Sequence, residues 1–207
     1  MEILDLKKQL KEFYNAKPAP VFLTVPPMQF IKIDGEGNPN TSQDYSEVLQ
    51  TLYTVAYTLK FRVKKDLQID YPVMALEGLW WTQDMSLFSV GSKDNWQWTM
   101  MISLPDMITQ PLLDSAIDEA RRKKDLPAIH RLRFETYTEG LSAQLMHIGP
   151  YSAETENIKK LHAFIQENGY NFDGSIQKHH EIYLSDPNRT APEKLKTIIR
   201  QPVIAKQ

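Results

Sequence analysis

Residues 179–187 of the chain read HHEIYLSDP, a stretch typical of a β-strand that ends in a turn. Because strand side chains alternate between two faces, Ile182 and Leu184 are predicted to point one way, and His179, Glu181 and Tyr183 the other. If the aliphatic pair faces a core, the carboxylate faces either water or a cavity. Which of these applies depends on the fold around the strand.

The second half of the chain has the predicted order β-α-β-β. LSAQLMHIGPY (141–151) reads as a strand that ends in Gly-Pro. A helix follows it, with an apolar stripe at Ile158, Leu161 and Ile165 and a glycine at its end. HHEIYLSDP and then KLKTIIRQPV (194–203) supply the last two strands of this half.

The first half repeats the same order. MQFIKIDGEGNPN (28–40) reads as a strand, a helix is predicted over 44–60, and YPVMALEGLWW (71–81) and WQWTMMISLP (96–105) read as two antiparallel strands. Agreement in element order across both halves predicts a duplicated fold. We therefore expect an α+β protein in which two β-α-β-β modules, related by a pseudo-twofold axis, surround a central ligand cleft.

The remaining segments are predicted to flank or connect these modules. An amphipathic helix opens the chain, and another is expected near 111–124. The expected organisation is an N-terminal helix and linker at 1–19, the first module at 20–105, a connecting helix and linker at 106–139, and the second module at 140–204.

Composition excludes several classes of function. The chain has 207 residues, of which 42% are hydrophobic, so it can bury a core. Its 24 basic and 26 acidic residues give a net charge of -2, which argues against direct binding of nucleic acid. The absence of cysteine fits a reducing compartment. We find neither a signal peptide nor a membrane-spanning run in the sequence, so cytoplasm is the expected location.

The aromatic residues are concentrated in two places. Two of the four tryptophans form WW at 80–81 and the other two lie in WQW at 96–98. An indole N–H needs a hydrogen-bond partner when it is buried, so clustered tryptophans often line pockets and interfaces. The alternative is a tryptophan-rich core, and the sequence alone leaves both interpretations open.

Two long segments of the second half carry a family resemblance. HIGPYSAETENIKKLHAFIQENGY (147–170) and HHEIYLSDPNRTAPEKLKTIIRQPV (179–203) resemble the GyrI-like small-molecule-binding domain family, with its His-x-Gly-Pro-Tyr turn and its Glu-x-Tyr-Leu-x-Asp-Pro strand. With the first half, which resembles the stand-alone branch, the likeness spans about 20–204. It implies a cleft that binds drug-like molecules through aromatic walls and a buried glutamate, which by motif position is Glu181.

The same resemblance implies a reaction. Some stand-alone members resembling this chain are implicated as hydrolases that open the cyclopropane of DNA-alkylating natural products of the yatakemycin and duocarmycin type. Members that regulate transcription carry a helix-turn-helix unit, which we do not expect within the segment before KPAP (17–20). Adding water to such a cyclopropane needs flat aromatic surfaces, a base and a donor to the carbonyl oxygen, and requires neither a metal nor a cofactor.

The roles can be assigned to residues as hypotheses. Glu181 is expected to orient or deprotonate the water, with a pKa raised toward the working pH by poorly solvating rings. Tyr137 or Tyr183 is the expected hydroxyl donor. Stacking walls and further ligand contacts are expected from Trp81, Trp96, Trp98, Glu77, Met100 and Tyr71.

Other interpretations remain open at this stage. An aromatic pocket with one carboxylate also suits a protein that binds or sequesters lipophilic cations without chemistry. A protein-contacting module is the weakest alternative, although the helix near 111–124 and exposed sheet edges would permit a homodimer. Glu181 could simply be a surface carboxylate, and the adjacent His179 and His180 are read as ordinary polar positions rather than joint metal ligands.

Overall fold

The computed structural model describes residues 1–83, 93–172, 174 and 178–206, and the chain divides into two compact units. Helices and antiparallel strands occur together, so the α+β class is confirmed. Each unit collects segments that are far apart in sequence: the first comprises Met1–Lys11, Met28–Ala75 and Lys93–Tyr137, and the second comprises Glu12–Pro27, Leu76–Ser92 and Thr138–Gln207. The duplication, its twofold axis, the central cleft and the module boundaries stay predictions.

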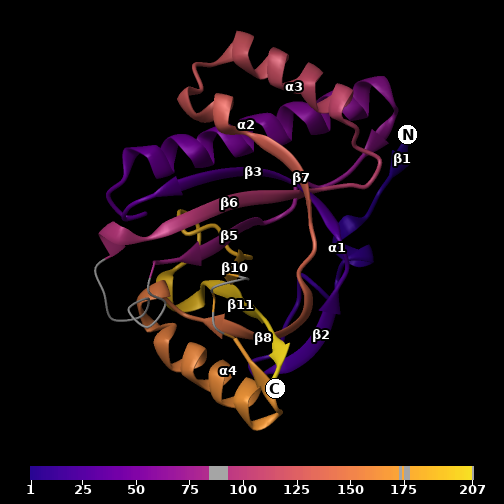
Figure 1. The fold of residues 1–207 in the computed structure, drawn as a ribbon. Coiled ribbons are helices and arrows are strands. Elements are labelled where there is room, and N and C mark those ends of the chain that lie inside the picture. The colour runs from indigo at the N-terminus through magenta and orange to yellow at the C-terminus, as the bar shows by residue number, and fades with distance from the viewer. Residues whose placement is uncertain (84–92, 173, 175–177, 207) are drawn as a thin grey trace. The chain divides into compact units, whose positions relative to one another are not determined.

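In the first unit, strand β3 (Met28–Glu36) pairs antiparallel with β6 (Gln97–Leu104) and with β7 (Arg133–Tyr137). Helices α2 (Gln43–Asp66) and α3 (Gln110–Lys123) pack against each other in this unit (Figure 1). The short elements β1 (Glu2–Ile3), α1 (Leu6–Gln9) and β4 (Ile69–Asp70) complete it.

Helix α2 is longer than the predicted range 44–60. It begins after Ser42, whose hydroxyl accepts a hydrogen bond from the backbone N–H of Tyr45, and it continues to Asp66. The apolar stripe of this helix, formed by Val48, Leu52, Val55 and Leu59, is fully buried, and Val63 extends the stripe by another turn. That extra turn explains why the helix does not end at residue 60.

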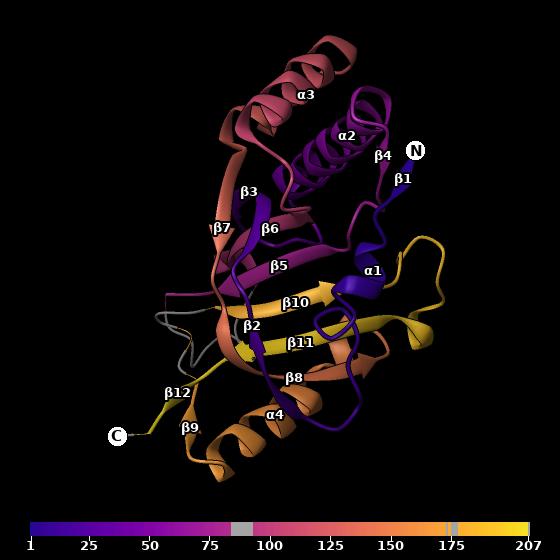
Figure 2. The same cartoon turned by 90° about the vertical axis from the view of Figure 1, so that its right-hand side faces the viewer.

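The second unit contains a five-stranded antiparallel arrangement in the order β2 (Val21–Val25), β8 (Gly140–Ile148), β11 (Lys196–Pro202), β10 (His179–Tyr183) and β5 (Leu76–Trp81). Helix α4 (Thr155–Glu167) lies along β8 (Figure 2). Its buried residues Leu161 and Ile165 form a core with Leu145 and Ile199. A short pair, β9 (Tyr170–Asn171) and β12 (Ile204–Ala205), follows.

Several single turns of 3-10 helix connect these elements. The structure has them at Lys93–Asn95, Pro127–Arg131, Tyr151–Ala153 and Pro192–Lys194. Among the residues described, none of the helices combines the length and the apolar character needed to cross a bilayer.

The register of β10 defines two faces of this sheet. Glu181 lies opposite Ile199 on β11, which in turn lies opposite Leu145 on β8. Since Leu145 and Ile199 pack against α4, Glu181 is on the helix-covered face. His180 lies opposite Arg200 and is on the other face, which we call the second face.

Candidate functional site

Glu181 is the centre of a hydrogen-bonded row on the helix-covered face, which we call the Glu181 row. Tyr183 donates its hydroxyl to Oε2 of Glu181 at 2.7 Å, and Nε2 of His179 lies 3.1 Å from Oε1. The glutamate is 8% exposed. The predicted alternation is therefore confirmed for His179, Glu181 and Tyr183, and the interpretation of Glu181 as an exposed surface carboxylate is wrong.

The row is extended at both ends by neighbouring strands. Trp80 on β5 donates its indole N–H to the hydroxyl oxygen of Tyr183 at 2.9 Å. At the other end, the side-chain amide of Gln201 on β11 lies 3.2 Å from Nδ1 of His179. His179 and Gln201 are each 1% exposed, so the interpretation of His179 as an ordinary polar position is also wrong.

The surroundings of Glu181 favour its charged form. Burial alone would raise the pKa of its carboxyl, but hydrogen bonds from His179 and Tyr183 hold that pKa below its usual value. The expected upward shift is wrong, because the expectation counted the rings around the carboxyl and not the donors. Glu181 is an oriented, ionised carboxylate, suited to hold a water molecule or a positive charge.

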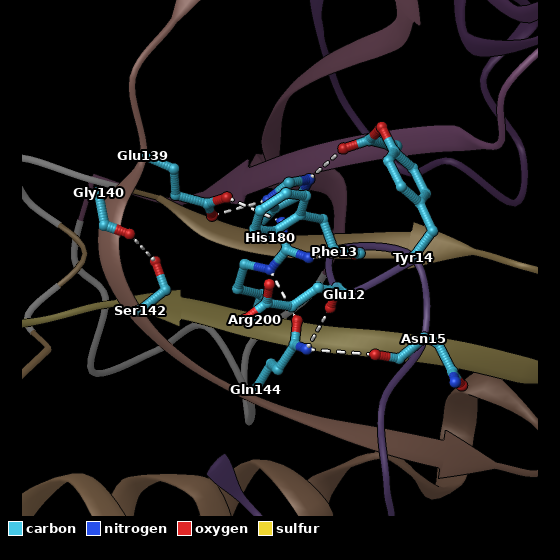
Figure 3. Close-up of polar contacts among 11 residues, drawn as sticks. Glu12, Phe13, Tyr14, Asn15, Glu139, Gly140, Ser142, Gln144, His180 and Arg200 are labelled. Atoms are coloured by element: carbon cyan, nitrogen blue, oxygen red, sulfur yellow. Dashed lines mark hydrogen bonds and ion pairs between the residues drawn. The ribbon is translucent and has the colours of Figure 1, made fainter. Parts of the chain in front are cut away.

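The second face carries a cluster of four buried ionisable residues, Glu77, Glu139, His180 and Arg200. Figure 3 labels the last three of them. His180 lies between the two carboxylates, with Nδ1 2.7 Å from Glu139 and Nε2 2.9 Å from Glu77. Glu139 also accepts a hydrogen bond from Arg200 at 3.1 Å. Two negative and two positive groups thus balance one another, and we call these four residues the buried ion cluster.

Charge pairing sets the protonation of this cluster. Burial opposes the charged imidazolium, but Glu139 and Glu77 together raise the pKa of His180 to about 9. Burial would likewise raise the pKa of Glu139, and His180 with Arg200 lowers it below its usual value. His180 is therefore a cation at neutral pH, which corrects its interpretation as an ordinary polar position.

The buried ion cluster and Gln144 also hold residues 12–15, which follow α1 (Figure 3). The hydroxyl of Tyr14 donates to Glu77 at 2.5 Å, and Arg200 donates to the backbone carbonyl of Phe13. Gln144, which accepts from Arg200 at 3.0 Å, donates to the carbonyls of Glu12 and Asn15, each at 3.4 Å. Every charged member therefore has partners inside the protein, as expected for a group that stabilises the fold.

The three tryptophans that were predicted to contact a ligand lie in different surroundings. Trp81 lies on the second face, and Nζ of Lys178 is 5.2 Å from its ring centroid. Trp98 is fully buried in the first unit, where its indole donates to the carbonyl of Gly37 at 3.2 Å. Trp96 has Nζ of Lys93 4.8 Å from its ring. The interpretation of clustered tryptophans as core therefore describes Trp98, and the ligand-contacting roles of all three stay predictions.

The remaining candidates, Met100, Tyr71 and Tyr137, belong to the first unit. Met100 is fully buried, and the hydroxyl of the buried Tyr71 has no hydrogen-bond partner among the described residues. Burial raises the pKa of Tyr71. Tyr137 packs edge-on against Phe30, with ring centroids 6.3 Å apart, and Nζ of Lys32 lies 5.2 Å from its centroid. Their proposed roles toward a ligand are not tested by these contacts.

Sequence reasoning missed three members of the Glu181 row and its surroundings. Trp80 was passed over in favour of Trp81, and Gln201 and Glu154 were not singled out. Only the register between strands reveals that Trp80 and Gln201 share a face with Glu181. Among the described residues, no group of three or more His, Cys, Asp or Glu side chains is arranged to hold a metal ion.

The chain matches a known protein family over most of its length. Residues 18–204 match the family described as the GyrI-like small molecule binding domain. A crystal structure of an uncharacterized conserved protein from Listeria innocua is 40% identical, with a TM-score of 0.90 over 97% of this chain and 100% of that one. The comparison with curated proteins finds no match.

Two further crystal structures from Listeria innocua are titled as hydrolases. One is 38% identical, with a TM-score of 0.85 over 97% of this chain and all of that chain. The other is 39% identical, with a TM-score of 0.87 over 99% of this chain and all of that chain. The similarity therefore covers nearly the full length of both partners, and it extends to proteins that carry the name of an enzyme class.

Proposed function

Because the chain belongs to the GyrI-like small-molecule-binding domain family, we propose that it binds planar aromatic molecules and hydrolyses cyclopropane-bearing DNA alkylators of the yatakemycin and duocarmycin type. The observation that carries the proposal is the buried, ionised carboxylate of Glu181, held by donors on both of its oxygens. The hydrolase titles of relatives that are 38% and 39% identical support an enzymatic reaction.

The reaction needs one water molecule and no cofactor. The water oxygen bonds to the methylene carbon of the cyclopropane, and the carbon–carbon bond to the spiro centre breaks. The electron pair of that bond moves into the cyclohexadienone, which becomes a phenolate, and the water proton passes to Glu181 and then to the phenolate oxygen. A carboxylate that positions the water lowers the entropic cost of the attack and accepts the proton as it leaves.

The hydrogen bonds distinguish the two candidate tyrosines. Tyr183 gives its hydroxyl hydrogen to Glu181 and accepts from Trp80, so in this state it orients the carboxylate. Tyr137 therefore remains the candidate donor to the dienone oxygen. Trp80 joins the proposed aromatic contacts, because it shares the face of Glu181. Trp96, Trp98, Met100 and Tyr71 are retained from the sequence, whereas Trp81 and Glu77 lie on the second face and are not retained as contacts of a ligand held by Glu181.

The test is to incubate the purified protein with a spirocyclopropane alkylator and follow the compound by liquid chromatography and mass spectrometry. We expect the parent protein to convert the compound to a product heavier by one water, and Glu181→Gln to reduce the rate at least about a hundredfold, as for loss of a general base. Glu156→Gln, at an exposed position on α4, is the matched control and should keep the parent rate. Equal rates for the parent and Glu181→Gln would exclude the proposed role of Glu181.

A second candidate function is binding without chemistry. The ionised Glu181 lies beside Tyr183, and the ring of Tyr151 meets the ring of Tyr183 edge-on with centroids 5.7 Å apart. A carboxylate among rings suits a lipophilic cation. In the same experiment this function predicts that a cationic aromatic compound binds and is recovered unchanged, while the spirocyclopropane compound gains no water.

A further inference from the structure

We propose that His179 and Gln201 are positioning residues that fix the orientation and the charge of Glu181. The inference rests on the proposed function only for its consequence in catalysis. Its geometry is a chain of three side chains from two neighbouring strands, in which Gln201 contacts Nδ1 of His179 at 3.2 Å and His179 contacts Oε1 of Glu181 at 3.1 Å.

The chemistry of the groups fixes the direction of both hydrogen bonds. A carboxylate oxygen only accepts, so Nε2 of His179 carries the hydrogen that lies toward Glu181. The side-chain amide nitrogen of Gln201 only donates, so Nδ1 of His179 is the acceptor. Gln201 therefore selects the tautomer in which Nε2 of His179 is the donor to Glu181, as hydrogen-bond partners of functional histidines commonly do.

The carboxylate of Glu181 is then held at both oxygens. Tyr183 donates to Oε2 and His179 to Oε1, so rotation of the carboxylate breaks both contacts. The remaining lone pairs point in fixed directions, which is what the proposed reaction requires of a group that aligns water with the cyclopropane carbon. Without His179, Oε1 loses its donor in a buried place.

Other titratable groups on this face surround the chain. Glu154, before α4, hydrogen-bonds to Glu181, and His162 on α4 interacts with Gln201 and with His179. Burial lowers the pKa of His162. On β8, His147 is bonded to Asn157 at 2.9 Å and to the carbonyl of Pro150 at 3.1 Å. Of these groups, Glu154 is the one that joins His179 and Tyr183 in bonding to Glu181.

The experiment measures the protonation of Glu181 directly, so that it does not depend on turnover. The side-chain carboxyl carbon of Glu181 is followed by ¹³C NMR as pH varies, with the signal assigned by its loss in Glu181→Gln. We expect the parent midpoint below that of an ordinary glutamate, and His179→Leu to raise it by about one pH unit or more, because a donor to the charged form is lost. His179→Gln, which keeps an amide donor, should stay nearer the parent.

A second variant covers the case in which His179→Leu does not fold. Gln201→Leu keeps His179 but removes the donor to Nδ1, so imidazole ¹⁵N shifts should report loss of the single Nε2–H tautomer, with a smaller rise in the Glu181 midpoint. An unchanged midpoint in every folded variant of His179 and Gln201 would overturn the proposal. A merely structural role would change stability and leave the midpoint and the tautomer as they are.

Turnover separates this inference from the proposed function. If the parent protein hydrolyses the spirocyclopropane compound, the acid limb of its rate profile should move upward in His179→Leu with the NMR midpoint. A shifted midpoint in a protein that adds no water would retain the positioning roles and exclude the hydrolase. Hydrolysis by the parent protein, with an NMR midpoint of Glu181 that does not change in the variants, would retain the hydrolase and exclude the positioning roles.

Discussion

At the scale of single residues, the surroundings of a side chain decide its chemistry more than its type does. Trp80 and Trp81 are adjacent, yet Trp80 bonds to Tyr183 and Trp81 lies near Lys178 on the opposite face. Glu181 and Glu77 are both buried carboxylates on neighbouring strands, but one belongs to the Glu181 row and the other to the buried ion cluster. In each pair, the two residues lie on opposite faces of the sheet, because side chains alternate along a β-strand.

A residue-scale prediction concerns Gly35, which lies directly against Trp98. A Cβ added to Gly35 would lie 2.0 Å from Cη2 of Trp98, so Gly35→Ala should force the indole or the strand to move. We expect a loss of about 1–3 kcal/mol in the free energy of unfolding, measured by urea denaturation.

The matched control for this prediction removes the obstruction. In a Trp98→Leu background the methyl group that Gly35→Ala adds has room, so the cost of Gly35→Ala should shrink well below its cost in the parent. The same cost in both backgrounds would contradict packing of Gly35 against Trp98 as its cause.

At the scale of elements, local periodicity was predictable and strand register was not. The shared face of His179, Glu181 and Tyr183 follows from alternation within one strand, and the buried stripe of α2 follows from helical spacing. The partners Trp80 and Gln201 come from strands about a hundred residues earlier and about twenty residues later, and only pairing places them. The pKa of Glu181 was misjudged because alternation places His179 and Tyr183 on its face but does not show that both donate hydrogen bonds to its carboxylate.

The segment 12–17 also depends on partners that are distant in sequence. It has no regular structure of its own and is fastened through Tyr14 to Glu77, and through the backbone of Lys17, whose carbonyl accepts from Met146 at 2.8 Å. Tyr14→Phe removes the donor to a buried carboxylate, so we expect a loss of about 1.5–3 kcal/mol in the free energy of unfolding.

Hydrogen exchange would locate the effect of Tyr14→Phe. The amide of Met146 should lose protection more than the amides of α2, because the segment opens before the fold does. Tyr57→Phe, at an exposed tyrosine of α2, is the matched control and should change neither quantity. Equal loss of protection throughout the chain would argue against a local fastening role for Tyr14.

At the scale of the whole molecule, two units are each assembled from discontinuous segments. Pairing between segments that are distant in sequence therefore builds each unit. The ionisable groups that this pairing buries make the free energy of unfolding depend on pH. In the second unit the buried ion cluster links β5, β10 and β11 to Glu139 before β8. Its net balance of charge at neutral pH is the condition under which four such groups can be buried together.

The pH dependence of stability follows from the sign of each shift. The pKa of His180 is raised to about 9, so its contribution is complete below the unfolded value near 6.5 and is lost as pH rises through 9. The pKa of Glu139 is lowered, so its contribution is present above about 4.3 and is lost as pH falls through its folded value. We expect maximum stability between these limits, and a fall of up to about 3 kcal/mol between pH 6.5 and 9.5.

Urea unfolding at closely spaced pH values tests this expectation, and Glu139→Gln assigns the alkaline limb. Removing the carboxylate that contributes most to the raised pKa of His180 should bring that pKa down, so stability should begin to fall at a lower pH than in the parent, on top of a general loss of about 3–5 kcal/mol from a broken buried pair. Glu156→Gln should leave the whole profile in place. A parent profile that is flat from pH 6.5 to 9.5 would show that His180 is not held as a cation, and the charge balance of the buried ion cluster would then have to be revised.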